Sequence, residues 1–309
     1  MSVSNQIALN IHNETGSLKS LILGIANNFG GTPSFKDCFD PQSRYHVNNN
    51  SFPIQNDIIR EINSLYDVLK KYKVKIYNPT NINGLNQIFA RDIGFVLQNK
   101  IIIPNIIEDR KDEILALNKI MNSLDENQII HMPPGANVEG GDVTIHNGYV
   151  FIGVSSDDDF NKFQVARTNY EGFNFLKKKF ENLNFIPLEL FKSDDDPLEN
   201  VLHLDCCFQP IGSNGAIVYP GGFKYKKDVN FLIDYFGKEN VLLITSNEMK
   251  TMYSNIFSIN EKVIISDKRF VRLNKWLTEN NFIVEEIDYC EISKMGGLFR
   301  CSTMPLERI

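Results

Sequence analysis

Apolar and polar residues recur along the chain with two periods, one typical of strands and one typical of helices. Within residues 54–72, apolar side chains that include Ile58, Ile62, Leu65 and Leu69 recur every three or four positions, which predicts an amphipathic helix. The short segment that follows alternates charged and apolar residues up to a proline, as a half-buried strand does. The pattern therefore predicts a helix followed by a strand.

The succession of a hairpin, a helix and a strand recurs along the rest of the chain. Two hairpin turns read Asn-Gly, at residues 147–148 and 214–215, which is the strongest short-range hairpin signal. A long polar loop is expected over residues 30–53. The expected helices cover residues 54–72, 109–124, 168–182, 229–236 and 270–279. Five ββαβ units in one closed ring would make residues 1–309 a single α/β domain, and an ordinary α/β sheet of hairpins and helices is the alternative.

The C-terminal segment combines two glycines, an arginine and a cysteine with an apolar run suited to a strand. Gly296 and Gly297 let backbones approach closely, and the run after Cys301 is expected to end at Pro305. The pattern predicts a closing strand that delivers Cys301 to a shared cleft. A buried, unreactive cysteine in a final strand is the alternative, because free cysteines are commonly buried.

Three segments that open predicted strands carry ionisable residues among apolar neighbours. They read Arg91-Asp92, Glu139-Gly140-Gly141-Asp142 and His203-Leu204-Asp205. In a ring of repeated units, equivalent strand ends converge on the axis, so these groups and the Cys301 thiol would share one pocket. His203 and Asp205 lie two positions apart in a predicted strand and would face the same side. Surface ion pairs, polar turns and a solvated strand face are the alternative interpretations.

Composition narrows the classes of function. A net charge of −6 argues against a nucleic-acid-binding surface. Five cysteines without a framework spacing, no signal-peptide pattern and no run long enough to span a bilayer favour a cytoplasmic protein without membrane contact. The sequence has no Walker-type or dinucleotide-binding glycine motif, and His203 with Cys206 and Cys207 fits no ordinary zinc spacing. No cofactor and no metal is therefore expected.

A thiol, an imidazole and several carboxylates in one pocket have a coherent chemical meaning. Carboxylates can bind a planar cation with several N–H donors, which describes a guanidinium. The bound cation and protonated His203 favour the thiolate of Cys301, which attacks the guanidinium carbon while His203 protonates the departing nitrogen. The expected partner is a small cationic guanidine, and a homodimer is left open.

These motifs together resemble the guanidino-group-modifying enzymes, which include arginine deiminases, dimethylarginine dimethylaminohydrolases and amidinotransferases. The resemblance covers nearly the whole chain in the family's motif order and ends in Gly297-Leu298-Phe299-Arg300-Cys301-Ser302-Thr303-Met304-Pro305-Leu306. It implies a pentein, a five-bladed α/β propeller with pseudo-fivefold symmetry, and a covalent amidino-cysteine intermediate. By the same resemblance Cys301 is the nucleophile, His203 the general acid/base and Glu139 the residue that orients His203.

The resemblance also implies which residues bind the substrate. Asp92 and Asp205 resemble the guanidinium-binding carboxylates, and Asp142 is expected to contribute to the same binding site. Residues 152–155 followed by Arg167 and its neighbours resemble the family's Gly-x-Ser…Arg-Thr element, here interrupted by an acidic insertion. The arginine of that element commonly holds the substrate carboxylate, so Arg167 is expected to do so here.

The expected activity is that of a hydrolase acting on arginine or a substituted arginine, which gives a ureido product with ammonia or an amine. The Arg-Cys-x-x-Met-Pro-Leu ending leans towards arginine deiminases, but the chain shows no sign of their extra helical domain, so the guanidine is left open. An amidinotransferase, which delivers the same intermediate to an amine, is the second interpretation. A non-catalytic pentein that binds a ribosomal subunit is the third, and the Cys301, His203 and Asp205 set argues against it.

Overall fold

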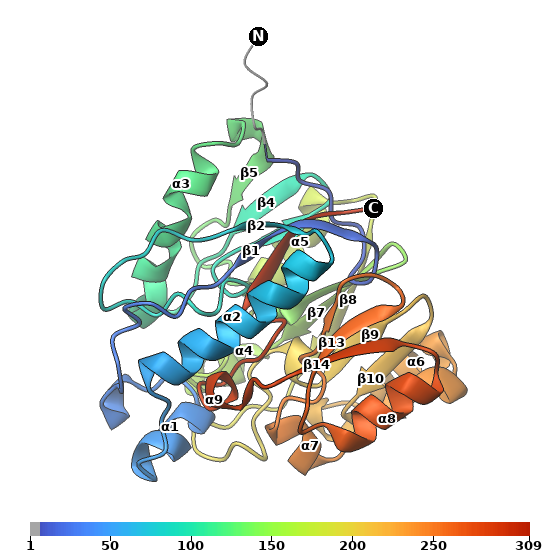
Figure 1. The fold of residues 1–309 in the computed structure, drawn as a ribbon. Helices are drawn as coiled ribbons and strands as arrows, with labels where there is room; N and C mark the ends of the chain where they lie inside the picture. Colours follow the sequence, from blue (N-terminus) through green and yellow to red (C-terminus); the bar gives the residue numbers. More distant parts are fainter. Residues whose placement is uncertain (1–6) are drawn as a thin grey trace.

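Five three-stranded sheets follow one another in the computed structural model, which describes residues 7–309 (Figure 1). In four sheets, two consecutive strands form an antiparallel hairpin, and a third strand pairs in parallel with the second after a helical connection. Their strands are β3 (Phe95–Leu97), β4 (Lys100–Ile103), β5 (Ile129–His131); β6 (Val143–His146), β7 (Tyr149–Val154), β8 (Asn184–Glu189); β9 (Phe208–Ile211), β10 (Gly215–Val218), β11 (Val241–Leu243); and β12 (Phe257–Ser258), β13 (Val263–Asp267), β14 (Ile283–Ile287). The predicted hairpin–helix–strand repeat and the α/β class are confirmed.

The remaining sheet joins the two ends of the chain, because β1 (Leu18–Leu23) lies between β15 (Thr303–Arg308) and β2 (Lys75–Tyr77). The predicted closing strand is confirmed: β15 pairs antiparallel with β1. It runs through Pro305 to Arg308 instead of ending at the proline. Proline has no backbone N–H to donate. It is tolerated there because β15 is the outer strand of this sheet, so that the backbone groups on one of its sides face no further strand of the sheet.

The helices lie between the strands in sequence, and α3, α6 and α8 form part of the periphery of the molecule (Figure 1). Four predicted helices are confirmed, with slightly different ends, as α2, α5, α6 and α8. The α-helices are α1 (Pro41–Asn48), α2 (Gln55–Lys71), α3 (Asn118–Met121), α4 (Asp157–Lys162), α5 (Tyr170–Lys179), α6 (Lys226–Phe236), α7 (Ser246–Lys250), α8 (Val271–Glu279) and α9 (Cys290–Ser293). The 3₁₀ segments are η1 (Phe35–Asp37), η2 (Glu108–Leu117), η3 (Glu126–Gln128), η4 (Gly140–Asp142), η5 (Leu204–Cys206), η6 (Pro220–Gly222) and η7 (Lys238–Asn240).

The prediction of one α-helix over residues 109–124 is wrong. Most of this segment is the 3₁₀ helix η2, and only the short α3 is α-helical. Arg110, Glu113 and Ala116 are buried at a spacing of three, which matches the three residues per turn of a 3₁₀ helix. The tighter winding places Arg110 and Glu113 on the same inward side.

Two further expectations are corrected. The loop over residues 30–53 contains α1, whose N-cap Asp40 accepts a hydrogen bond from the Ser43 amide and precedes a proline at the first helical position. None of the three segments predicted to open strands does so. Arg91 and Asp92 lie in a turn before β3, and the segments that hold Glu139 and His203 are followed by 3₁₀ turns η4 and η5, which precede β6 and β9. The argument that alternation places His203 and Asp205 on one strand face therefore fails.

Strand β1 is buried on both sides, and this fixes the C-terminal segment. Leu21 and Leu23 belong to one buried apolar cluster, whereas Ile22 belongs to a second cluster with Met304 and Leu306 of β15. Strand β15 is therefore largely buried and is not part of a frayed tail, whereas the last residue, Ile309, is exposed. Within residues 7–309, no helix has the length and apolar character needed to cross a membrane.

Candidate active site

Cys301 lies in the turn that directly precedes β15, and the residue is 2% exposed. The Asn255 side chain holds it twice, since Nδ2 donates to Sγ at 3.2 Å and Oδ1 accepts from the Cys301 amide at 3.2 Å. The Cys301 carbonyl accepts from the Arg91 amide at 3.0 Å. A Cβ atom on Gly297 would come within 2.4 Å of the Phe89 ring, so this turn requires glycine. These contacts fix the position of the thiol.

Asp205 lies beside the thiol, with its Oδ2 atom 3.7 Å from the Cys301 Sγ atom. The same oxygen accepts a hydrogen bond of 2.9 Å from Arg300 Nη1. Arg300 also donates to Glu14 at 3.0 Å and to the Val143 carbonyl at 2.6 Å. The fully buried Arg300 thus fixes Asp205 against the thiol and compensates its charge.

His203 forms the second part of the site, together with Glu139 and Asp92. Its Nε2 atom lies 2.9 Å from Glu139 Oε2, and its Nδ1 atom lies 3.7 Å from Asp92 Oδ1. A Cβ atom on Gly141 would come within 2.6 Å of the imidazole, so this glycine permits the close approach. Arg167 Nη1 lies 3.4 Å from both carboxylate oxygens of Glu139.

Asp142 has a different environment from the other predicted carboxylates. One oxygen accepts from the Thr168 hydroxyl at 2.6 Å, and the other accepts from the Leu204 amide at 2.9 Å. These contacts join the segment before β6 to the turn that carries His203. The structure therefore brings Cys301 and Asp205 together, and His203 with Glu139, Asp92 and Arg167, while Asp142 binds the turn that supports them.

Opposed electrostatic effects set the charge of the imidazole. Burial lowers the pKa of His203, but the carboxylates of Asp92, Asp142 and Glu139 outweigh it and raise this pKa to about 9. Burial also raises the pKa of Glu139, but Arg167 and His203 outweigh it and lower that pKa to about 2. Near neutral pH the pair is therefore an imidazolium hydrogen-bonded to a carboxylate.

The surroundings of the Cys301 thiol favour its neutral form, in contrast to the charged imidazole. Burial raises the pKa of Cys301, and the carboxylates of Asp205 and Asp92 raise it further, against smaller opposing contributions from the Leu298 backbone and the Asn255 side chain. In the protein without substrate, the protonated His203 therefore does not suffice to lower the pKa of the Cys301 thiol. A positive charge placed between the two carboxylates would be needed to lower this pKa.

Arg110 is a site residue that motif reasoning missed. It donates to Asp92 Oδ2 at 3.0 Å and forms a bidentate pair with Glu113 at 2.9 and 2.8 Å. The feature that marks Arg110 is its burial at the three-residue spacing of η2, and this burial is known only from the folded chain. Asn255 was missed as well, because a single asparagine far from every motif carries no signal in one sequence.

Asp92, Glu139 and His203 also form a set with metal-ligand geometry, since one potential ligand atom of each lies within 4.8 Å of the others. The donor set fits a metal poorly. Glu139 lies within ion-pair distance of Arg167 and Arg110, and a metal ion would have to displace a proton from His203, whose pKa is raised.

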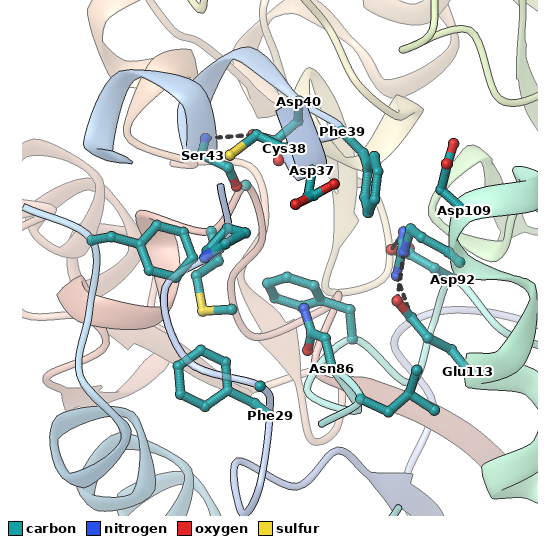
Figure 2. Close-up of a pocket in the computed structure, with 18 of the residues that line it drawn as sticks. Phe29, Asp37, Cys38, Phe39, Asp40, Ser43, Asn86, Asp92, Asp109 and Glu113 are labelled. Carbon is teal, nitrogen blue, oxygen red and sulfur yellow. Dashed lines mark hydrogen bonds and ion pairs between the residues drawn. The ribbon is translucent and has the colours of Figure 1, made fainter. Parts of the chain in front are cut away.

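A pocket of about 330 Å³ reaches this site (Figure 2). Asp92, Arg110 and Arg167 line its inner part, and the loop from Phe29 to Ser43 lines much of the rest. Figure 2 shows Glu113 beside Asp92, with Asp37 and Phe39 on another side of the open space. A small molecule in this pocket would meet a carboxylate that also contacts the imidazole.

Comparison with known proteins gives a family. The model of the family described as N,N dimethylarginine dimethylhydrolase, eukaryotic, matches residues 39–308. The uncharacterized protein YkgA of Bacillus subtilis (strain 168) is 29% identical over 247 residues, which are 79% of this chain and 78% of that protein.

Solved structures share the fold. The N-terminal domain of ArgZ, an arginine dihydrolase from the ornithine–ammonia cycle in cyanobacteria, has a TM-score of 0.78 at 16% identity, over 94% of this chain and 98% of that one. SxtG, an amidinotransferase from Microseira wollei in the saxitoxin biosynthetic pathway, has a TM-score of 0.76 at 16% identity, over 97% of each chain. The inosamine-phosphate amidinotransferase StrB1 from Streptomyces griseus has a TM-score of 0.75 at 15% identity, over 98% of this chain and 97% of that one.

Proposed function

The chain belongs to the N,N dimethylarginine dimethylhydrolase family of guanidino-modifying enzymes, and we propose that it hydrolyses a C–N bond of a small guanidine through a covalent bond to Cys301. The observation that carries the proposal is the buried Cys301 thiol, whose Sγ atom lies 3.7 Å from Asp205 Oδ2 and whose pKa is raised by burial and by the carboxylates of Asp205 and Asp92. Arginine and substituted arginines are the substrate class that the family and the sequence motifs suggest. The five free cysteines fit a reducing compartment such as the cytoplasm.

Asp92 and Asp205 are proposed to bind the guanidinium. Asp92 Oδ1 is buried and has no hydrogen-bond partner within the protein, so it is free to accept an N–H group. Asp205 is held by Arg300 next to the thiol. A guanidinium between these carboxylates would bring a positive charge to the thiol and lower the pKa of Cys301, so that binding of the substrate generates the nucleophile.

The reaction then proceeds in two steps. Cys301 Sγ forms a bond to the guanidinium carbon, and the bond from this carbon to the departing nitrogen breaks as His203 donates a proton to that nitrogen. His203, now neutral, accepts a proton from water as the water oxygen attacks the amidino carbon. The S–C bond breaks, and the products are a ureido compound and the free cysteine.

The other predicted residues act through His203. Glu139 orients the imidazole through its bond to Nε2, which leaves Nδ1 towards Asp92 and the substrate. Arg167 compensates the charge of Glu139, and Asp142 holds the turn that carries His203. Asp142 is therefore proposed as a positioning residue and not as a direct substrate ligand.

We also propose that the five sheets close into the five-bladed propeller of penteins and that residues 1–309 form one catalytic domain. The pairing of β1 with β15 supports closure, because it joins the first and last parts of the chain. The amide of Leu18 in β1 also donates to the carbonyl of Ile259, next to β12.

Incubation with a panel of guanidines, with and without amine acceptors, tests the proposal. We expect a ureido product together with ammonia or an amine when no acceptor is present, as identified by mass spectrometry. Turnover that occurs only with an acceptor would replace hydrolysis by amidino transfer, which shares the covalent intermediate. No turnover of any guanidine under either condition would contradict both activities.

A further inference from the structure

A buried asparagine contacts the Cys301 sulfur, and the orientation of its amide is fixed by the groups that it faces. Asn255 is 0% exposed and lies just before β12. Its Oδ1 atom accepts from the Cys301 amide at 3.2 Å, and its Nδ2 atom donates to Cys301 Sγ at 3.2 Å. Because a backbone N–H can only donate, the side-chain atom that faces it must be the oxygen, and the NH₂ group must face the sulfur.

The segment that carries Asn255 is itself bonded to the site on two sides. The Ser254 hydroxyl donates to the Asp205 carbonyl at 2.8 Å, and the Asn255 carbonyl accepts from the Arg300 amide at 3.3 Å. The N–H donor is therefore in place at the sulfur before any substrate binds, and it needs no rearrangement to stabilise a negative charge there.

Several other groups around the sulfur disfavour a negative charge. The Asp205 carboxylate lies 3.7 Å from Sγ, and Asp92 also raises the pKa of Cys301. Cys206 and Tyr289 interact with the same thiol, but burial raises the pKa of both, so they are neutral near neutral pH. A donor fixed at this sulfur therefore opposes the effect of the carboxylates.

The sulfur carries negative charge twice in the proposed reaction, before it attacks the guanidinium carbon and again when the S–C bond breaks. At the second point the electrons of that bond return to the sulfur, while the carbon ends in a neutral ureido product. The positive charge of the substrate is then lost, whereas a donor that belongs to the protein is present at both points.

We infer that Asn255 is a further catalytic residue, whose Nδ2–H group stabilises the thiolate of Cys301 when it attacks and when it is released. The inference rests on the proposed function, because it takes Cys301 to be the nucleophile. It differs from a role in positioning alone, which would need the bond from the Cys301 amide to Oδ1 but not the bond from Nδ2 to the sulfur.

Asn255→Asp separates the two roles, because aspartate has nearly the same shape and can still accept from the Cys301 amide, but it replaces the N–H donor at the sulfur by a carboxylate oxygen. Asn255→Ala removes both contacts. The rate at which iodoacetamide alkylates Cys301, measured over a range of pH by peptide mass mapping, reports the thiolate in the protein without substrate. We expect this rate at a given pH to fall about ten- to a hundred-fold in both variants, because loss of a donor to the thiolate raises the pKa of the thiol.

The kinetics of turnover provide a second measurement. The chemical step of Asn255→Ala should slow by a similar factor, and its dependence on thiolate should move to higher pH. Guanidine affinity, measured by calorimetry in the Cys301→Ser background, should change less than about three-fold, since Asn255 lies outside the described pocket lining.

Asn274→Ala is the matched control. Asn274 is a buried residue of α8 whose amide accepts from the Ser266 hydroxyl at 2.6 Å and donates to the Asp267 carbonyl at 2.9 Å, so its loss removes comparable contacts elsewhere. Its alkylation curve should match that of the original protein. An equal fall in this control would show that alkylation follows general loosening of the fold and would overturn the inference.

The two Asn255 variants give distinct answers. An Asn255→Asp variant that is alkylated at the original rate would show that the asparagine only positions the thiol, and an unchanged Asn255→Ala would show that it has no role. Either result overturns the inference and leaves the proposed function standing. Turnover retained in a folded Cys301→Ser variant would instead refute the proposed function, and the inference with it.

Discussion

Replacement of Cys301 by serine is expected to lower guanidine turnover by at least about 10⁴-fold, because an alcohol is a far poorer nucleophile than a thiolate and its proton is not lost near neutral pH. The substitution nearly preserves shape, so the fold and the Asn255 contacts should remain. Steady-state product formation measures the first effect, and circular dichroism with thermal unfolding measures the second.

Cys290→Ser provides the matched control. This cysteine is partly exposed in α9 and lies outside the proposed site, so its replacement should leave turnover within about two-fold of the original. Activity retained in a folded Cys301→Ser variant would place the nucleophile elsewhere. Loss of activity in the control alone would indicate that turnover depends on α9 and not on the thiol beside Asp205.

His203→Ala is the second substitution with a large expected effect. It removes the group that gives and takes protons, so the rate of the chemical step should fall about 10²- to 10⁴-fold. Guanidine affinity should change much less, since Asp92 and Asp205 remain. Single-turnover kinetics and calorimetric binding separate the two effects, and His131→Ala, an exposed histidine at the end of β5, is the control.

The same variant reports the charge of the imidazole. The pKa of His203 is raised from its ordinary value of 6.5 to about 9 in the folded protein. Its contribution to stability is therefore fully present below pH 6.5 and is lost as the pH rises through about 9. The difference in the free energy of unfolding between the original protein and His203→Ala should shrink over this range. A difference independent of pH would mean that His203 is not a stabilised imidazolium.

The sequence predicted the elements whose signals are local. The Asn-Gly turns, the apolar faces of α2, α5, α6 and α8, and the strand after Cys301 depend on neighbouring residues, and the structure contains them. The motifs also contain the groups that meet at the site. The expectation that His203 and Asp205 lie on the same face of one strand was wrong. Three residues of η5 form a 3₁₀ turn because tertiary contacts, such as the Asp142 bond to the Leu204 amide, fix that conformation.

The remaining properties depend on contacts between distant segments. Arg110 reaches Asp92 only because η2 winds with three residues per turn, whereas the apolar pattern suggested an α-helix. The raised pKa of Cys301 arises from burial and from carboxylates far away in the sequence, so no local motif could reveal it. The bonds of Arg167 to Glu139 and to the carbonyls of Gln164 and Phe39 are likewise visible only in the folded chain.

The most direct measurement is the mass of the peptide that contains Cys301 after acid quenching during turnover of a slow guanidine. The account predicts that this peptide gains one amidino group, that the gain disappears in Cys301→Ser, and that peptides with the other four cysteines stay unmodified. Rapid turnover without any modified Cys301 peptide, or an amidino group on a different cysteine, would contradict the covalent mechanism.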